Sequence, residues 1–217
     1  MYENQGRSAQ RTPFKKTFDS GDIAKKNKTR RTGLRKQNRN NIINKRRKAE
    51  SFQINETTMS FIEQFPAAIE NIRNGDLLNG LQHFRKALSV KDNPPIQKCI
   101  DVGIVDIVVS LLGKAPDTSI AVECLWILIN VAAGDHEHVE VLVNHNAIPL
   151  LAKIIAHSTD DIKKEAVWAM GNIVEDDAKH RDIAITCGLL KAIDDIMTSN
   201  ASSPERRMIT LNTISRM

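Results

Sequence analysis

Two tryptophan–asparagine pairs are the residues with the clearest chemical potential. Trp126 and Asn130 are four residues apart, as are Trp168 and Asn172, and 42 residues separate the two pairs. Residues four apart lie on one face of a helix, so each pair presents an indole beside an amide. An amide can donate to and accept from a peptide unit, and an indole attracts Lys or Arg by about 0.5–2 kcal/mol. The joint recurrence predicts a ladder that binds an extended basic peptide, in preference to core packing alone.

Acidic residues near the second pair suit the cationic ends of such a peptide. They are Glu165, Glu175, Asp176 and Asp177. Parallel indoles form slots for the methylene stems of Lys and Arg, and nearby carboxylates would pair with the charged heads. We therefore expect the ladder and these acids to form one binding surface.

The elements that position the ladder also repeat. Apolar periodicity is helical throughout residues 51–217, and each 42-residue unit is predicted to contain a short helix, a second helix and a longer third helix. Gly103, Asn146 and Gly188 separate the first and second helices, where a left-handed cap residue is useful. Asp117 and Thr159 are the expected N-caps of the third helices. Three helices in a 42-residue period predict an all-α solenoid.

The units that flank the two pairs are atypical. One period before Trp126 stands Phe84, with Leu88 in the place of the asparagine, as expected of a capping unit. After Trp168 the expected third helix is 204–217. Ile209 or Thr210 stands in the place of the tryptophan, and Thr213 or Ile214 in that of the asparagine. The ladder is thus expected to lack a third rung and to leave apolar surface uncovered on the last helix.

Charge divides the chain of 217 residues into two parts. Residues 1–50 contain 16 basic and 4 acidic side chains, whereas residues 51–217 contain 15 basic and 22 acidic ones. The basic segment has too few apolar residues to offset its ordering entropy of about 1–2 kcal/mol per residue, so we expect it to be disordered alone and helical on an acidic partner. A solvated arm that touches nucleic acid non-specifically is the alternative, which composition by itself favours.

Composition excludes several classes of protein. Aromatic residues are 4% of the chain, which disfavours an aromatic-rich β-sandwich or barrel. Three widely spaced cysteines argue against a disulfide framework and indicate a reducing compartment. We expect no membrane insertion and no secretory signal, because no long apolar run is present. His136, His138 and His145 are expected in a solvated loop rather than at zinc, and no catalytic motif, cofactor or metal site is indicated.

These residues together resemble the importin α family of armadillo-repeat receptors for nuclear localisation signals. The resemblance rests on the Trp-x-x-x-Asn ladder in 42-residue units, on segment 165–176 and on the basic segment, and it covers the chain from about Phe14 onward. It implies an armadillo-repeat right-handed α-solenoid of about three to four units, where the family has about ten. The domains are then 1–50, an importin-β-binding segment, and 51–217, with units at about 58–93, 94–134, 135–177 and 178–217, the last incomplete.

The resemblance also implies roles for particular residues. The peptide-binding positions are Trp126, Asn130, Gly134, Glu165, Trp168, Asn172 and Asp176. Glu165 stands where Gln is usual in the family, and Val139 where Thr is usual. The importin-β-binding positions are Arg30, Arg31, Leu34, Arg35, Lys36, Arg39, Lys45, Arg46 and Arg47. Lys45, Arg46, Arg47 and Lys48 are implied to occupy the groove as an autoinhibitory segment.

The function that follows is that of a nuclear import adaptor. The expected partners are importin β and proteins with Lys/Arg-rich signals, and the expected location is shuttling between cytoplasm and nucleus. The alternatives are a nucleic-acid-binding protein and a generic armadillo scaffold, each using the basic segment. A nucleic-acid binder needs a basic face on its body, yet residues 51–217 are net acidic, so no specific nucleic acid is expected.

Overall fold

The computed structural model describes residue 41 and residues 58–90, 93–114, 116–199 and 204–215. All of them fall within one unit of the chain, residues 37–217. The predictions for the basic segment 1–50 therefore lie outside the described residues, with the exception of Asn41. Within these ranges every regular element is a helix. The helices are α2 (Thr58–Glu63), α3 (Phe65–Arg73), α4 (Leu77–Leu88), α5 (Ile96–Asp101), α6 (Ile104–Gly113), α7 (Thr118–Val131), α8 (His136–Asn144), α9 (Ala147–His157), α10 (Asp160–Asp176), α11 (Ala178–Thr186), α12 (Leu189–Thr198) and α13 (Pro204–Ile214).

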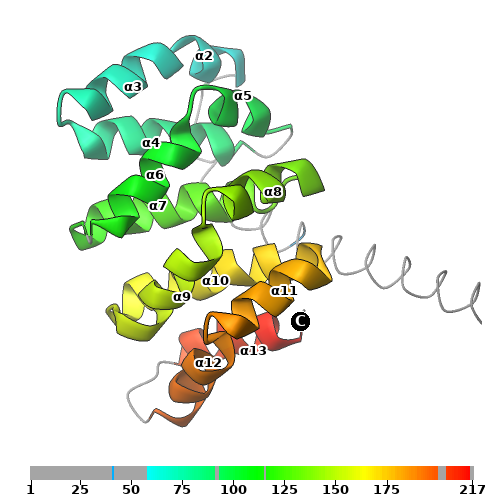
Figure 1. The fold of residues 1–217 in the computed structure, drawn as a ribbon. Coiled ribbons are helices and arrows are strands. Elements are labelled where there is room, and N and C mark those ends of the chain that lie inside the picture. Colours follow the sequence, from blue (N-terminus) through cyan, green and yellow to red (C-terminus); the bar gives the residue numbers. More distant parts are fainter. Residues whose placement is uncertain (1–40, 42–57, 91–92, 115, 200–203, 216–217) are drawn as a thin grey trace, which may run out of the picture. The chain divides into compact units, whose positions relative to one another are not determined.

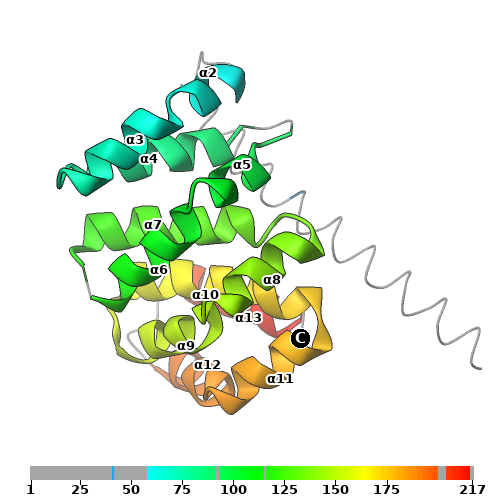
Figure 2. The ribbon, with the colours of Figure 1, turned by 45° about the horizontal axis from the view of Figure 1, so that its top comes forward.

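The helices repeat in groups of three: α5–α7, α8–α10 and α11–α13. The third helix of each group packs on the third helix of the next, so that α4, α7, α10 and α13 form one continuous row (Figure 1). The second helices α6, α9 and α12 contact one another in the same order, and Figure 2 shows both rows from a second direction. This is the arrangement of an α-solenoid, and it confirms the predicted fold class.

The third helices are buried because neighbours cover them on more than one side. Leu125 and Leu128 of α7 have no exposed surface, and neither do Val167 and Met170, which are 42 residues further on in α10. Burying such a side chain fully is worth roughly 1.5–3 kcal/mol. The same positions are therefore apolar in consecutive units, and their burial joins each unit to the next.

The predicted turns between first and second helices are confirmed. Gly103, Asn146 and Gly188 have φ angles of 81°, 58° and 90°, in the left-handed region. Asp117 and Thr159 stand at the N-cap positions of α7 and α10, also as predicted. Neither described side chain accepts a capping hydrogen bond, however, so their contribution to the helix ends is smaller than a full cap of about 1 kcal/mol.

The two ends of the described solenoid differ in what they expose. Phe84 and Leu88 of α4 are fully buried. On α13, Met208, Leu211 and Ile214 are exposed at spacings of three residues, which places them along one side of the helix. Within the described residues no single helix is both long and apolar enough to cross a membrane; α8 and α9 reach that length and composition only together, and they are bent by 71° at their junction.

The three cysteines take small positions in or against the core. Cys99 and Cys124 are fully buried free thiols, and Cys187 is half-buried against the core. Burial raises the pKa of the Cys99 and Cys124 thiols to about 12. Both therefore stay protonated at neutral pH and serve as small apolar residues.

Candidate functional site

The structure brings the two tryptophan–asparagine pairs together on adjacent helices. Trp126 and Asn130 lie on α7, Trp168 and Asn172 lie on α10, and α7 packs directly against α10 (Figure 2). Both indoles are half-buried, and Trp168 packs against the hydrophobic core. We call the side of α7 and α10 that carries these four residues the ladder face.

The asparagines are buried more deeply than a peptide-binding ladder requires. Asn130 is 2% exposed and Asn172 is 0% exposed. Asn130 Nδ2 donates to the Trp126 carbonyl at 3.0 Å, whereas Asn172 Nδ2 donates to the carbonyl of Ile129 on α7 at 3.2 Å. The first bond lies within one helix and the second joins two units. Each amide therefore already makes a hydrogen bond within the solenoid. Contact of either amide with a peptide remains a prediction.

The next unit shows which residues stand in register with the missing third rung. Thr213 Oγ1 lies 3.1 Å from the Ile209 carbonyl, four residues earlier, just as Asn130 bonds to Trp126. The same hydroxyl lies 3.3 Å from the Val167 carbonyl on α10. Ile209 and Thr213 therefore replace the pair, and a β-branched aliphatic side chain offers no indole face to a cation.

An arginine that the sequence did not single out occupies the first rung. Arg85 Nε of α4 lies 2.6 Å from Glu123 Oε2 of α7, and its guanidinium carbon lies 5.7 Å from the Trp126 ring centroid. The side chains of Arg85 and Glu123 are only 19% and 12% exposed. The chain thus supplies its own cation to Trp126. No sequence pattern pointed to this contact, because Arg85 and Glu123 are 38 residues apart.

Glu165, which the sequence suggested as a partner for peptide cations, is buried beside a lysine of the same chain. Lys164 Nζ is 3.8 Å from Glu165 Oε1. Glu165 stands 42 residues after Glu123, so the two acids have equivalent places on α7 and α10. In both units the structure pairs the acid with a cation of this chain. A contact between Glu165 and a basic peptide remains a prediction.

Asp176 belongs to a cluster of two histidines and two carboxylates at the C-terminal end of α10. His136 Nδ1 lies 2.6 Å from Asp176 Oδ2, and His180 Nδ1 lies 3.7 Å from the same oxygen. Glu140 Oε1 is 2.9 Å from His180 Nε2 and 3.7 Å from His136 Nε2. The imidazole rings stack with centroids 6.1 Å apart and planes at 19°. The cluster joins α8, α10 and α11.

Two groups of this region titrate away from their ordinary values. The hydrogen bond with Asp176 raises the pKa of His136, and partial desolvation opposes that effect. The backbone N–H of Lys179, 2.8 Å from Asp177 Oδ1, lowers the pKa of Asp177. His136 is therefore charged at a higher pH than a free histidine, next to a carboxylate predicted to bind cations.

His136 and His138 lie in helix α8 and His145 is its C-cap residue, so the prediction of a solvated loop is wrong. His136 opens the helix, His138 Nδ1 accepts the N–H of the N-cap residue Asp135 at 3.0 Å, and His145 Nδ1 lies 2.7 Å from the Val141 carbonyl. Val139 and Leu142 bury the inner side of this helix. Three polar residues in its first turn gave the segment the composition of a loop.

Gly134 follows the first ladder helix where space is restricted. A Cβ atom at this position would overlap the His138 ring and come within 3.1 Å of the Val131 carbonyl. The glycine thus allows α8 to begin close to the end of α7. Its predicted contact with a peptide is not tested by this packing.

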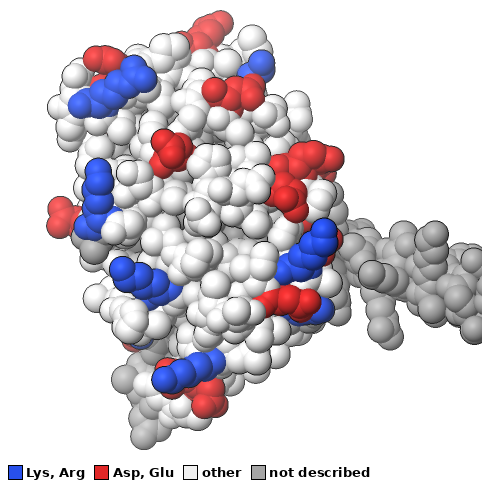
Figure 3. All heavy atoms as spheres, viewed as in Figure 1, with Lys and Arg blue, Asp and Glu red and all other residues white. Residues whose placement is uncertain are grey.

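Charged side chains are unevenly spread on the outer surface. In the view of Figure 3 acidic side chains gather over α8, while the centre of that face carries few charges. The acids of α8 are Glu137 and Glu140, both beside His136. The neighbourhood of Asp176 is therefore rich in negative charge, which suits a cationic ligand.

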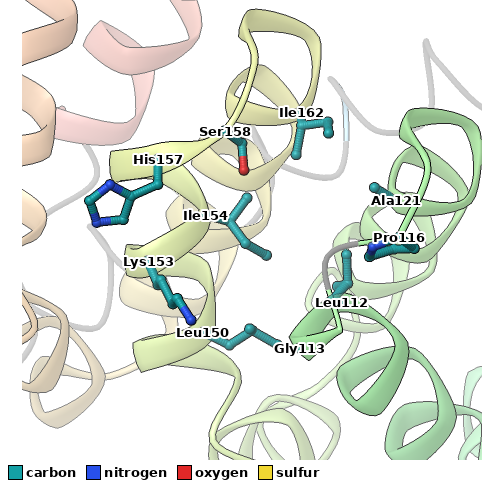
Figure 4. Close-up of a pocket in the computed structure, with 10 residues that line it drawn as sticks. All are labelled: Leu112, Gly113, Pro116, Ala121, Leu150, Lys153, Ile154, His157, Ser158 and Ile162. Carbon is teal, nitrogen blue, oxygen red and sulfur yellow. The ribbon is translucent and has the colours of Figure 1, made fainter.

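A pocket of about 200 Å³ lies between the second helices and the start of the third helices (Figure 4). Leu112 of α6, Leu150 and Ile154 of α9 and Ile162 of α10 line it, and Lys153 stands at its side. Ile162 is in the first turn of α10, whereas Asp176 ends that helix. The pocket is therefore separate from the ladder face, and no sequence pattern pointed to it.

Comparison with known proteins agrees with this geometry. The family model for the armadillo/β-catenin-like repeat matches residues 135–175. Importin subunit alpha-2 of Arabidopsis thaliana is 28% identical over 203 residues, which are 86% of this chain and 38% of that protein. The probable importin subunit alpha-A of Dictyostelium discoideum is 25% identical over 96% of this chain and 44% of its own length. The chain is similar to importin α subunits over most of its length.

The match extends to other importin α subunits and to solved armadillo structures. Importin subunit alpha-1a of Oryza sativa subsp. japonica is 33% identical over 59% of this chain and 25% of that protein. A designed armadillo repeat protein in complex with the peptide (KR)4 superposes with a TM-score of 0.60 at 24% identity, covering 72% of this chain and 62% of that one. The chain spans between a quarter and under half of the length of these curated relatives.

Proposed function

We propose that this chain is a nuclear import adaptor that binds Lys/Arg-rich nuclear localisation signals on the ladder face. The observation that carries the proposal is the pair of half-buried indoles, Trp126 and Trp168, on the adjacent helices α7 and α10, with the Asp176 carboxylate at the C-terminal end of α10. Indoles take cationic side chains with their apolar stems, and a carboxylate neutralises the charged end. Similarity to importin α subunits over most of the chain supports the same function.

The remaining parts of the proposal concern the basic segment. Its cationic side chains link cargo to importin β, and Lys45–Lys48 competes with cargo for the ladder face. Shuttling between cytoplasm and nucleus follows from an adaptor role. A scaffold for another partner, or a protein that binds nucleic acid through residues 1–50, is the second candidate, favoured by the net charge of +12 in that segment.

The test of the ladder face is a binding titration of the full chain with a fluorescent Lys/Arg-rich peptide. Trp168→Ala should weaken binding by about thirtyfold, since a central interface tryptophan is typically worth 2 kcal/mol or more. Its melting temperature should change less than truncation of a fully buried tryptophan requires, because the indole packs against the core with only part of its surface buried. Lys153→Ala, an exposed change on α9 outside the ladder face, is the matched control.

Two controls separate the proposal from its alternatives. A peptide of the same length with Glu for Lys and Arg should not bind the wild-type chain. Unchanged peptide affinity of Trp168→Ala combined with a strongly lowered melting temperature would show that the indole acts in packing alone. Loss of importin β binding when Arg30, Arg31, Arg35 and Lys36 are replaced by Ala in the full chain tests the role of the basic segment, with an RNA oligonucleotide as the competing ligand.

A further inference from the structure

The carboxylate that the proposed function assigns to cargo already has a partner within the chain. Asp176 is 13% exposed, and its Oδ2 is held at 2.6 Å by His136 Nδ1. A carboxylate with so little open surface has few free directions from which a second cation can approach. A peptide ammonium or guanidinium that reaches Asp176 Oδ2 must therefore share or displace the imidazole.

The His136 side chain can move away from Asp176, whereas the neighbouring His180 side chain cannot. The His136 side chain is 53% exposed, so it can rotate into solvent without opening the core. His180 is 2% exposed and is fixed by Glu140 at 2.9 Å. Protonation of His136 adds a positive charge beside Asp176, and removal of the proton leaves the acids of the cluster uncompensated.

We propose that His136 and a cationic side chain of the bound peptide compete for the Asp176 carboxylate, so that protons weaken peptide binding and peptide binding expels a proton. The proposal rests on the proposed function and adds its regulation. The protonation of His136 then sets how tightly a peptide cation binds at Asp176. Arg85, by contrast, carries a permanent charge in its buried contact with Glu123, so the contact at Trp126 does not respond to pH in this range.

The sign of the effect follows from every charge that faces His136. Glu137 and Glu140 of α8, Asp176 of α10 and Asp177 at the start of α11 favour the imidazolium, while Lys179 of α11 adds positive charge nearby and the ring of His180 stacks on that of His136. The hydrogen bond to Asp176 raises the pKa of His136 in the free protein. A peptide cation at Asp176 removes that support and lowers the pKa. Between the two pKa values affinity rises with pH, by at most about tenfold per pH unit for one proton, and outside them it is flat.

The experiment measures fluorescence anisotropy of a labelled Lys/Arg-rich peptide with the full chain from pH 5.5 to 8.5 at constant ionic strength. Lys and Arg side chains of the peptide do not titrate in this range. The wild-type chain should bind several-fold more tightly as the pH rises through the window. His136→Gln, which keeps a polar side chain without a titrating charge, should show a flat profile near the wild-type affinity at high pH. His157→Gln, an exposed change on α9, should keep the wild-type slope.

A second measurement needs no variant. The NMR titration of the His136 imidazole should show a lower pKa with saturating peptide than without it. Wild-type binding that does not depend on pH, or an equal slope in His136→Gln, overturns the competition while leaving the adaptor function intact. Failure of the wild-type chain to bind the peptide at every pH overturns the proposed function, and the competition with it.

Discussion

Breaking the buried pair between Arg85 and Glu123 should destabilise the solenoid far more than removing an exposed charge. Arg85→Met leaves the Glu123 carboxylate, 12% exposed, without the guanidinium that lies 2.6 Å from it. Removing one partner of a fully buried pair costs about 3–5 kcal/mol. Because both groups retain some exposure, we expect about 2–4 kcal/mol, which includes about 0.5–2 kcal/mol for the contact of Arg85 with Trp126.

The assay is urea and thermal unfolding of the full chain, monitored by circular dichroism. It compares wild type with Arg85→Met, Glu123→Gln and the double variant. For a chain of 150–250 residues a loss of about 3 kcal/mol lowers the melting temperature by roughly 6–12 °C. The double variant leaves neither charge unpaired, so it should be more stable than the sum of the two single losses predicts, by about 2 kcal/mol. Arg73→Met, which removes an exposed arginine 3.8 Å from Glu70, should cost less than about 0.5 kcal/mol.

Two results would refute this reasoning. Single losses below about 1 kcal/mol that add in the double variant would mean that solvent screens the pair as it screens a surface ion pair. A double variant as unstable as the sum of the singles would mean that the aliphatic and amide replacements disturb the packing of α4 on α7 instead. Either outcome would also remove the argument that Trp126 is engaged by a permanent internal cation.

Two further predictions concern packing and competition. Gly80→Ala should lower the free energy of unfolding by about 1–3 kcal/mol, because its Cβ would overlap the Ile72 side chain and lie 2.7 Å from the Ala68 carbonyl. Gly113→Ala, which has open space at the Cβ, should be neutral or stabilising by up to about 1 kcal/mol. Thermal unfolding of the two variants compares them. Replacing residues 45–48 with Ala should tighten binding of a basic peptide, because a tethered competitor has an effective concentration near millimolar; unchanged affinity in a titration where both forms bind the peptide argues against autoinhibition.

The fold could be predicted well from the sequence because the repeat period and the turn residues can be read directly along the chain. Trp126 and Trp168 fixed the period, and the left-handed residues Gly103, Asn146 and Gly188 fixed the corners between helices. A residue that must adopt positive φ is visible in the chain itself, since few side chains tolerate that conformation. Helix order and stacking then follow from the period.

The candidate site was predicted less completely because its contacts cross between units. Arg85 and Glu123 are 38 residues apart, and His136 and Asp176 are 40 apart. Periodicity shows which residues share a helix face, but it does not show which side chain of the preceding unit reaches across to them. For the same reason the bond from Asn172 to the Ile129 carbonyl, which joins α10 to α7, was not anticipated.

The exposed apolar residues of α13, Met208, Leu211 and Ile214, indicate which part of the solenoid unfolds locally at the lowest free energy. Met208 and Leu211 stand in register with Val167 and Met170 of α10, which are fully buried. Within the described residues the α8–α10 unit has a neighbouring unit on each side, whereas α11–α13 has one only on the side of α8–α10. In a linear array each shared interface adds to the protection of the unit it joins, so backbone amides of α13 should exchange with deuterium through a local opening of lower free energy than those of α10. Such fraying would leave the rungs at Trp126 and Trp168 assembled, because their helices lie inside the array.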